Sequence, residues 1–424
     1  MTLLKKKLEY KWVIVAACFT MIFAGLGFCS GTKGIFLAPV TEALQIPRSM
    51  YAINDSLRFL STAGLNLFFG ALVMKFGPRK LIGCGLMMLV CSMLAYSFAE
   101  NVYMIYLGGI LLGAGLTFAG TTMVGYVVNI WCKESRGTVM GAILCANGLG
   151  SAVAAPVLTP IIYTDDPFSY RTAYRMIAIT LFVITLIIIA VFRDAPNKGE
   201  QLPQVSKKKA KGNIWTGISL KEALRKPYFY LGAVCVFMTG MILQGVNGVS
   251  SAHFKDVGHD PSFVAIVVSV HALSLAAFKF LVGVFYDKKG LRTTMLICDV
   301  AAVIMIGLLA AATTGPLGQG LALGYGIISS LALPLETIML PLIATDLFGE
   351  KDYPKLLGIL VSINTAGYAL GAPLSNLCFD MFSNYRPIFL VYVGLMAAVA
   401  ALFMVVLSMA KKQRERIQAQ EAAS

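Results

Sequence analysis

The sequence predicts an all-α membrane protein with twelve transmembrane helices arranged in two pseudo-symmetric six-helix bundles. Three observations support this fold class. Of the 424 residues, 58% are hydrophobic and only 13% are charged, whereas soluble chains carry about 25% charged residues. Apolar stretches of about 20 residues, the length that crosses a bilayer, occur twelve times. Two sequence motifs also recur at fixed offsets, which is typical of transporters built from repeated bundles.

The predicted spans form two groups of six on either side of a polar segment. The first six cover residues 12–32, 50–74, 81–99, 102–130, 138–161 and 173–192. The second six cover residues 228–250, 262–286, 293–313, 317–345, 357–380 and 386–409. The segment between them is rich in Lys, Gly and Pro, a composition typical of a linker. We therefore expect an N-terminal bundle at 1–192, a cytoplasmic linker at 193–227, a C-terminal bundle at 228–410 and a cytoplasmic tail at 411–424.

The basic residues favour one orientation of these spans. Most of the 35 Lys and Arg residues fall at the N-terminus, in the even-to-odd loops, in the linker and in the tail. The opposite loops hold Arg48, Arg171, Arg175, Lys255 and Arg386. Because Lys and Arg collect on the cytoplasmic side, we expect a multi-pass protein of the cell membrane with both termini in the cytoplasm. The first apolar run has no clear cleavage site, so we expect an uncleaved helix and not a signal peptide.

Composition and motifs disfavour several classes of function. The formal net charge of +14 is spread among the loops, so we expect no nucleic-acid partner. The nine cysteines include no C-x-x-C pair, and we predict neither a metal site nor a disulfide framework. A G-x-x-x-x-G-K-[ST] loop is absent, which disfavours ATP-driven transport. No triad or paired carboxylates stand out, so we expect neither enzymatic activity nor a cofactor.

A glycine-containing turn occurs twice in the chain. The second copy lies in KFLVGVFYDKKGLR and has the spacing G-x-x-x-D-x-x-G-x-R, with Gly283, Asp287, Gly290 and Arg292. The first copy, 213 residues earlier, has Gly70, Gly77 and Arg79, with Met74 in the position of the Asp. The motif resembles the cytoplasmic loop signature of the major facilitator superfamily, which joins the second and third helices of each half. The resemblance implies a gating loop whose Asp helps to hold one state of the transport cycle.

A second set of residues recurs at an offset of 217. The members of the first copy are Gly141, Asn147, Gly150, Ala152, Ala155 and Pro156. The members of the second are Gly358, Asn364, Gly367, Ala369, Ala372 and Pro373. The two Asn residues could donate hydrogen bonds to a substrate, or they could bind neighbouring helices together.

Lys279 is the deepest basic residue in the predicted spans. A cation near the centre of a bilayer helix costs about 2.5 to 3.5 kcal/mol, so it normally faces a polar cavity or a partner. We interpret Lys279 as an electropositive contact for an anionic substrate. The alternative is a structural ion pair with Glu336 of the tenth helix.

Arg58 and His271 lie 213 residues apart, so the repeat predicts equivalent positions for them in the two halves. In the superfamily that the chain resembles, the second and eighth helices both border the central cavity. The resemblance therefore implies that each half contributes one side chain that can carry a positive charge. Arg58 could instead pair locally with Asp55, and His271 could be a buried neutral histidine with one hydrogen bond.

A narrower resemblance starts at Lys33. The stretch GTKGIFLAPVTEAL resembles the first helix of the monocarboxylate porter and oxalate:formate antiporter branch. Lys279 stands four residues before Gly283, where that branch has a substrate-binding Arg, and WCKESRG resembles its W-F-x-x-x-R-G stretch. Two departures limit the resemblance. Leu275 stands where mammalian-type porters have a proton-coupling Asp, and the eleventh helix lacks the second cation of the oxalate:formate type.

These patterns predict a secondary transporter of a small, monocarboxylate-like organic anion that works by alternating access. Lys279, Lys33, Arg58, His271, Asn147 and Asn364 are the candidate substrate contacts. Glu336 and His271 are the candidates for proton coupling, because a buried Glu or His can carry a proton. Transport would proceed as proton symport or as exchange with a counter-anion. The alternatives are a drug or metabolite efflux transporter and a membrane receptor that does not transport.

Overall fold

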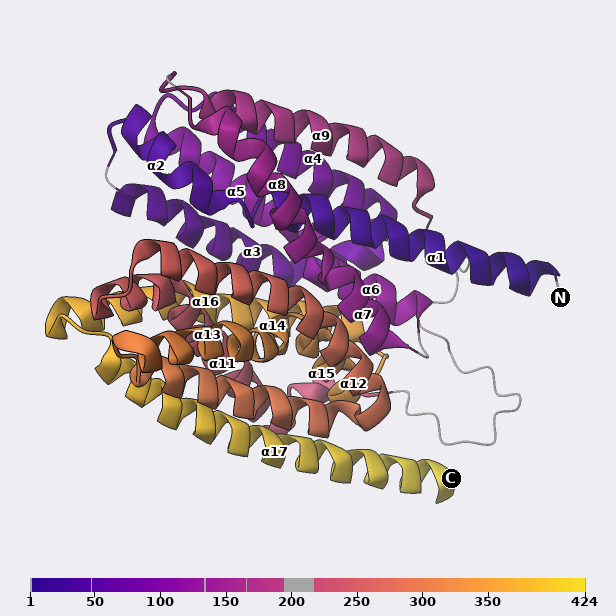
Figure 1. Cartoon of the computed structure of the whole chain (residues 1–424). Helices are drawn as coiled ribbons and strands as arrows, with labels where there is room; N and C mark the ends of the chain where they lie inside the picture. The colour runs from indigo at the N-terminus through magenta and orange to yellow at the C-terminus, as the bar shows by residue number, and fades with distance from the viewer. Residues whose placement is uncertain (1, 47, 133–134, 165, 194–216, 424) are drawn as a thin grey trace. The chain divides into compact units, whose positions relative to one another are not determined.

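The structure is all-α, as the composition and the length of the apolar stretches predict (Figure 1). This computed structural model describes residues 2–46, 48–132, 135–164, 166–193 and 217–423. Within these ranges no β-strand occurs, although Gly217 and Gly349 pair in an isolated antiparallel β-bridge. Most of the predicted linker, residues 194–216, lies outside the described residues.

The chain divides into two compact units. The first consists of Met1–Arg193 together with Leu275–Val284, and the second of Asp194–Ser274 with Phe285–Ser424. The bundle boundaries proposed from the sequence place Leu275–Val284 in the second half. In the structure, the backbone at Gly141 and at Gly137 closely approaches this segment within the first unit.

The first unit contains all helices up to residue 191. They are α1 (Thr2–Ile22), the π-helix η1 (Phe23–Phe28), α2 (Lys33–Ala43), α3 (Arg48–Phe76), α4 (Pro78–Ser97), α5 (Val102–Ala119), α6 (Thr121–Trp131), α7 (Arg136–Leu144), α8 (Ala146–Ile162) and α9 (Tyr170–Val191). Within this unit α4 lies alongside α5 and α9, and α3 packs on α5 (Figure 1).

The second unit contains the remaining helices, of which α12 also supplies Leu275–Val284 to the first unit. They are α10 (Leu220–Ala223), α11 (Pro227–Val257), α12 (Pro261–Ala310), α13 (Gly315–Ala332), α14 (Pro334–Thr337), α15 (Met339–Phe348), α16 (Tyr353–Phe382) and α17 (Arg386–Ala423). Helix α11 packs on both α16 and α17 (Figure 1).

In the described residues, eleven helical segments are long and apolar enough to cross a membrane. One of them, Ile266–Ala310, has 45 residues, or about 68 Å at 1.5 Å per residue, which is twice the thickness of the hydrocarbon core. Gly290 inside it has φ 77° and ψ 175°, so the helix is interrupted there. The segment therefore supplies two spans, and the predicted twelve-helix fold is confirmed.

Four predicted helices are interrupted where the sequence suggested continuous spans. The fourth divides at Gly120 into α5 and α6, and the fifth divides at Cys145 into α7 and α8. The first helix changes to π-helix at Phe23–Phe28 and then to a turn before α2 begins at Lys33. The tenth is divided into α13, α14 and α15. Pro334 and Pro341 lie in this region and cannot donate the backbone hydrogen bonds that a continuous helix requires.

The repeat is visible in how helices pack within each unit. A Cβ on Gly150 would lie 2.2 Å from the carbonyl oxygen of Phe23. A Cβ on Gly367, which is 217 residues later, would lie 2.3 Å from the carbonyl oxygen of Phe237. Only glycine permits such close backbone contact. The fifth helix of each unit thus packs against the first helix of that unit in the same way.

Turn geometry and loop contacts repeat as well. Gly77 has φ 79° and ψ 157°, close to the values at Gly290. The guanidinium of Arg171 donates to the carbonyl of Ala99 at 3.0 Å, and that of Arg386 donates to the carbonyl of Ala312 at 2.6 Å. In each unit, therefore, an arginine of the sixth helix binds the carbonyl end of the third.

The glycine contacts lead to a prediction about stability. Alanine at Gly150 or Gly367 places a methyl group against a backbone oxygen that cannot rotate away. Each substitution should cost about 1 to 3 kcal/mol, the range typical of overpacking, and should lower the unfolding temperature of the purified protein.

Gly64 and Gly394 are matched controls, because a Cβ at either position meets no neighbouring atom within 4 Å. Alanine there should leave the unfolding temperature unchanged or raise it slightly, since Ala favours a helix over Gly by up to about 1 kcal/mol. Equal unfolding temperatures for all four variants would contradict the packing account.

Candidate functional site

The interruption of the first helix positions Lys33. Glycines at positions 27 and 31 bring this helix against α8, where the hydroxyl of Ser151 donates to the carbonyl of Gly27 at 3.3 Å. The amide of Gly31 donates to the carbonyl of Leu26 at 2.8 Å, a π-type bond that ends the first segment. After a short turn α2 starts at Lys33, so this side chain lies at the end of a new helix. Such π-helical interruptions are frequent at functional sites.

Helix α3 supplies the partners of Lys33. Asp55 and Arg58 are three residues apart and lie on one face of this helix. Their backbone is held against α5, because a Cβ on Gly113 would lie 2.2 Å from the carbonyl oxygen of Arg58. The hydroxyl of Thr62 also donates to the carbonyl of Gly113 at 3.0 Å. The small residues of α5 therefore fix the position of this part of α3.

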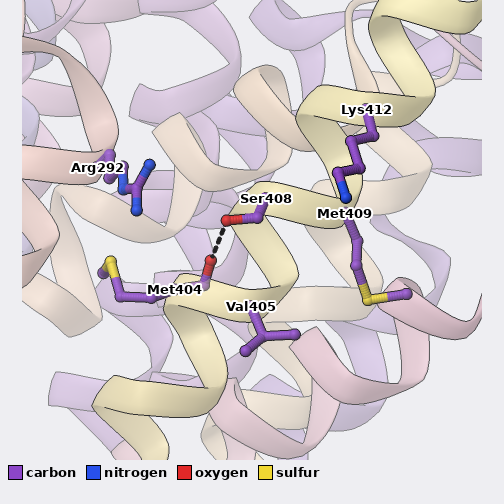
Figure 2. A pocket seen from close by; sticks show the side chains of 6 residues that line it. All are labelled: Arg292, Met404, Val405, Ser408, Met409 and Lys412. Atoms are coloured by element: carbon purple, nitrogen blue, oxygen red, sulfur yellow. Dashed lines mark hydrogen bonds between the residues drawn. The ribbon is translucent and has the colours of Figure 1, made fainter.

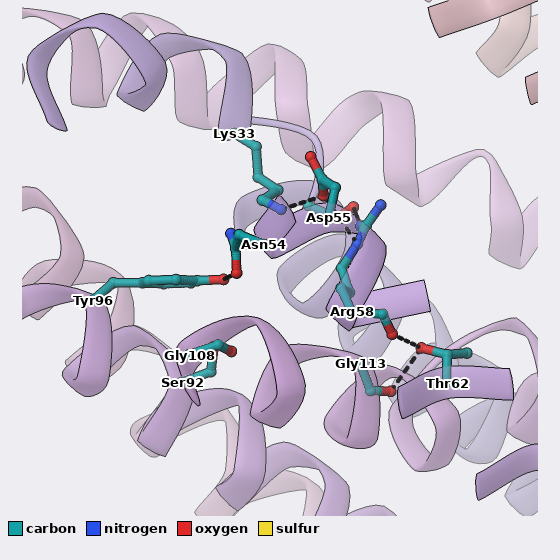
Figure 3. Close-up of polar contacts among 10 residues, drawn as sticks. Lys33, Asn54, Asp55, Arg58, Thr62, Ser92, Tyr96, Gly108 and Gly113 are labelled. Atoms are coloured by element: carbon teal, nitrogen blue, oxygen red, sulfur yellow. Dashed lines mark hydrogen bonds and ion pairs between the residues drawn. The ribbon is translucent and has the colours of Figure 1, made fainter. Parts of the chain in front are cut away.

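One polar cluster in the first unit contains Lys33, Asp55 and Arg58 (Figure 3). Together with Ser30 we call it the helix 1–2 cluster. The ammonium of Lys33 forms an ion pair with Oδ1 of Asp55. Nε of Arg58 lies 3.3 Å from the same oxygen, and Nη1 of Arg58 donates to the hydroxyl of Ser30 at 2.7 Å. Two cations thus share one carboxylate oxygen.

The helix 1–2 cluster has an excess of positive charge in a membrane-spanning part of the chain. The side chains of Lys33 and Arg58 are only 14% and 13% exposed, whereas that of Asp55 is 45% exposed. The positive end of the α2 dipole lies at Lys33 and adds to the field. Anions are stabilised at such a place, so the cluster can bind a further carboxylate.

An aromatic and amide layer lies beside the cluster. The hydroxyl of Tyr96 donates to Oδ1 of Asn54 at 3.1 Å, next to Asp55 in the chain (Figure 3). The ring of Tyr174 stacks on that of Phe36, with 4.0 Å between the ring centroids, and its centroid lies 5.1 Å from that of Tyr96. This packing shields one side of the cluster from water and strengthens its electrostatic interactions.

Lys279 is buried, with 4% of its surface exposed. It lies in the part of α12 that belongs to the first unit, where a Cβ on Gly141 would approach its carbonyl oxygen to 2.4 Å. Its ammonium is within electrostatic reach of the Cys145 thiol, at the junction of α7 and α8. The predicted deep cation is therefore present next to the fifth helix.

His271 belongs to a second polar cluster, in the second unit. Its Nδ1 lies 2.8 Å from the hydroxyl of Ser329 and 3.1 Å from that of Ser330, both on α13. The hydroxyl of Ser330 also donates to the carbonyl of His271 at 2.9 Å. Glu336, the other predicted proton carrier, is half-buried in the one-turn helix α14.

The two repeat-related asparagines have different surroundings. Asn364 is buried, and its amide donates to the carbonyl of Val236 on α11 at 3.0 Å, which is the helix-binding role that the sequence left open. Asn147 is half-buried near the start of α8. Its backbone carbonyl accepts a hydrogen bond from the hydroxyl of Ser151 at 3.0 Å.

The two glycine turns also differ in their side chains. Arg79 donates from Nε and Nη2 to the carbonyl of Ile189, at 3.1 and 2.8 Å, near the end of α9. Met74 is 54% exposed. In the second copy, a Cβ on Gly283 would lie 2.1 Å from the carbonyl oxygen of Gly137, so this glycine is required for close packing in the first unit. Gly70, which matches Gly283, lies in α3.

Sequence reasoning did not find the full helix 1–2 cluster. It considered Asp55 only as a local partner of Arg58 and did not connect it with Lys33. The i, i+3 spacing of Asp55 and Arg58 was a usable signal. The contact with Lys33 and Ser30 depends on the interruption of the first helix, which the apolar pattern alone does not reveal.

Sequence comparisons give the same family for both halves. The family model described as Major Facilitator Superfamily matches residues 14–253 and 232–423. The chain is 27% identical over 394 residues to monocarboxylate transporter 13 of Bos taurus, a match that covers 90% of this chain and 85% of the relative. It is 22% identical over 409 residues to the uncharacterized MFS-type transporter YcxA of Bacillus subtilis (strain 168), with 92% and 94% covered.

Solved structures share the fold at lower identity. A transporter of the same superfamily, FucP in the outward conformation, matches with a TM-score of 0.69 and 13% identity, over 95% of this chain and 99% of that chain. The proton:xylose symporter XylE matches with a TM-score of 0.69 and 16% identity, over 94% and 96%.

The shared carboxylate predicts a specific pattern of stabilities. Asp55→Asn leaves Lys33 and Arg58 adjacent without their counter-charge. Breaking a buried pair costs about 3 to 5 kcal/mol, and we expect part of this cost because Asp55 is half-exposed. The unfolding temperature should fall, and the added substitution Lys33→Gln should restore most of the loss.

Lys355→Gln is the control, because it breaks a pair with Asp352, at 3.3 Å, in which the lysine side chain is 37% exposed, against 14% for Lys33. Exposed pairs contribute at most about 1 kcal/mol. If Asp55→Asn is tolerated as well as Lys355→Gln, the shared pair contributes nothing to stability.

Proposed function

The chain belongs to the major facilitator superfamily, and from this premise we propose that it transports a small organic anion of the monocarboxylate type by alternating access. The proposal places it in the cell membrane with both termini in the cytoplasm. The helix 1–2 cluster is the observation that carries the choice of an anion. Two mostly buried cations there share one carboxylate oxygen, and a membrane-spanning segment tolerates such an excess charge only where an anion or water can reach it.

Asp55 suggests how binding and coupling are linked. In the empty protein its carboxylate holds the positions on Lys33 and Arg58 that a substrate carboxylate would need. A substrate anion therefore competes with Asp55 for these cations. Protonation of Asp55 would remove its charge and release both cations, so that binding of a proton would favour binding of the anion. This linkage is the basis of a proton symport mechanism.

Several further residues complete the proposal. Lys279 offers a third buried positive charge, and an ammonium gives a point charge where an arginine would bind a carboxylate with two parallel hydrogen bonds. His271, with its two serine partners, and Glu336 remain candidates for a proton step in the second unit. Similarity to monocarboxylate transporter 13 supports the substrate class. The glycine turns with Asp287 and Arg292 are proposed to gate the cycle.

Loss of a cation should abolish uptake of the anion. In proteoliposomes, Arg58→Gln and Lys279→Gln should each reduce kcat/KM for a radiolabelled monocarboxylate at least about tenfold, because a charge-assisted hydrogen bond to the substrate is lost. Lys279→Arg should retain part of the activity, since the positive charge is kept.

Lys411→Gln is the matched control, because it removes a lysine from the exposed end of α17 and should leave uptake unchanged. Lys279→Gln combined with Glu336→Gln tests the alternative of a structural ion pair. Recovery of uptake in this double variant would overturn the substrate-contact role of Lys279. Binding of the anion without accumulation in wild-type vesicles would instead indicate a receptor.

The competition at Asp55 predicts a pH dependence with a definite sign. Uptake by the wild type should increase as the pH falls, because Asp55 takes up a proton more readily once the substrate carboxylate displaces it from Lys33 and Arg58. In Asp55→Asn the cations are permanently released, so uptake should lose this stimulation while folded protein remains in the membrane.

His271→Gln and Glu336→Gln are measured in parallel over the same pH range. Loss of stimulation only in one of these variants would move the proton step to the second unit. If all three variants keep the wild-type pH profile, proton symport is excluded, and anion exchange, measured as counter-flow with unlabelled substrate, becomes the mechanism.

A further inference from the structure

Arg79 and Arg292 are related by the 213-residue repeat, but only the first has a carbonyl partner. Arg79 binds the carbonyl of Ile189, two residues before α9 ends. The matching helix of the second unit, α17, continues to Ala423 without such an end. The backbone carbonyls of α17 in this region accept hydrogen bonds from amides of the same helix. Among the ion pairs and hydrogen bonds of the described residues, none involves the side chain of Arg292.

Arg292 instead lines an open groove of about 330 Å³ on the second unit. The other lining residues all come from α17 and are Met404, Val405, Ser408, Met409 and Lys412. In Figure 2 the charged ends of Arg292 and Lys412 lie above the side chains of Met404, Val405 and Met409. The hydroxyl of Ser408 donates a hydrogen bond to the carbonyl of Met404 at 2.8 Å.

The groove is apolar at one end and basic at the other. Met404, Ser408 and Lys412 follow one another at intervals of four residues and share a face of α17. Lys412 is about 12 Å further along the axis than Met404 at 1.5 Å per residue. The apolar run of α17 ends at Ala410, and charged residues follow from Lys411 to Arg416. Lys412 therefore lies where α17 leaves the apolar layer, and the methionines lie within this layer. Arg292 directly follows the charged turn of α12 at Asp287–Gly290.

We propose that this groove binds an anionic phospholipid, whose phosphate is attracted by the cations Arg292 and Lys412 and whose acyl chain lies along Met404, Val405 and Met409. Both cations are exposed, as is Val405, so a lipid can reach all three from the side. Basic side chains at the edge of the bilayer attract anionic headgroups. Methionine adapts its shape to an irregular apolar ligand. A free phosphate would use the cations but would leave the apolar part of the groove uncovered.

The groove shares Arg292 with the gating turn proposed above, so the site is tested by lipid binding and not by transport. Purified full-length protein is titrated with phosphatidylglycerol or with phosphatidylcholine of the same acyl chains, and bound lipid is counted by native mass spectrometry. The wild type should retain one phosphatidylglycerol tightly. Arg292→Gln with Lys412→Gln should weaken this binding about 30-fold, since each basic residue contributes separately to headgroup attraction. Binding of phosphatidylcholine should be unchanged.

Lys411→Gln with Arg414→Gln is the matched control, because it also removes two positive charges, both from α17 beside the groove, but changes no lining residue. An equal loss of phosphatidylglycerol in this control would show general attraction to a basic tail and would overturn the proposed site. Displacement of the lipid by glycerol 1-phosphate at the same concentration would also overturn it in favour of a soluble phosphate. If the double variant does not fold, Lys412→Gln alone should weaken binding about fivefold.

Discussion

Backbone contact between the first and fifth helices of each unit is the constraint on which the rest of this structure depends. Lipid offers little hydrophobic drive for helices to associate, so close packing must supply the energy. Gly150 against Phe23 and Gly367 against Phe237 provide it at equivalent places. In the first unit the same contact requires glycines at positions 27 and 31. Those glycines weaken the first helix, which changes to π-helix and a turn just before Lys33.

The electrostatics of the candidate site follow from this interruption. A continuous first helix would direct Lys33 along a different face, whereas the new start of α2 brings its ammonium to Asp55. Arg58 completes the cluster because α5 holds α3 by its glycines at this level. Packing against glycine thus explains the positions of both Lys33 and Arg58. Its consequence is a net positive charge with a carboxylate partner that is itself half-exposed.

The two halves have kept their backbone and diverged in their side chains. Gly77 and Gly290 have almost the same φ and ψ, and Arg171 and Arg386 bind equivalent carbonyls. Arg58 corresponds to His271, one in an ion cluster and the other between two serines. The divergence at Arg79 and Arg292 has a simple cause, because α9 ends where α17 continues. A duplicated scaffold thereby presents different chemistry at matching positions.

The sequence by itself determined the fold class, the number of spans and the duplication, because apolar length and repeat spacing are local properties of the chain. It also identified Lys33, Arg58, His271 and Lys279 as unusual, since charge within an apolar run is costly wherever it packs. Only the tertiary structure decided which of these charges meet. Lys33 and Asp55 are 22 residues apart, and their contact depends on the interruption of the first helix by packing against α8. The use of Asn364 between helices and the groove beneath Arg292 were decided in the same way, because each depends on what a neighbouring helix places at that level.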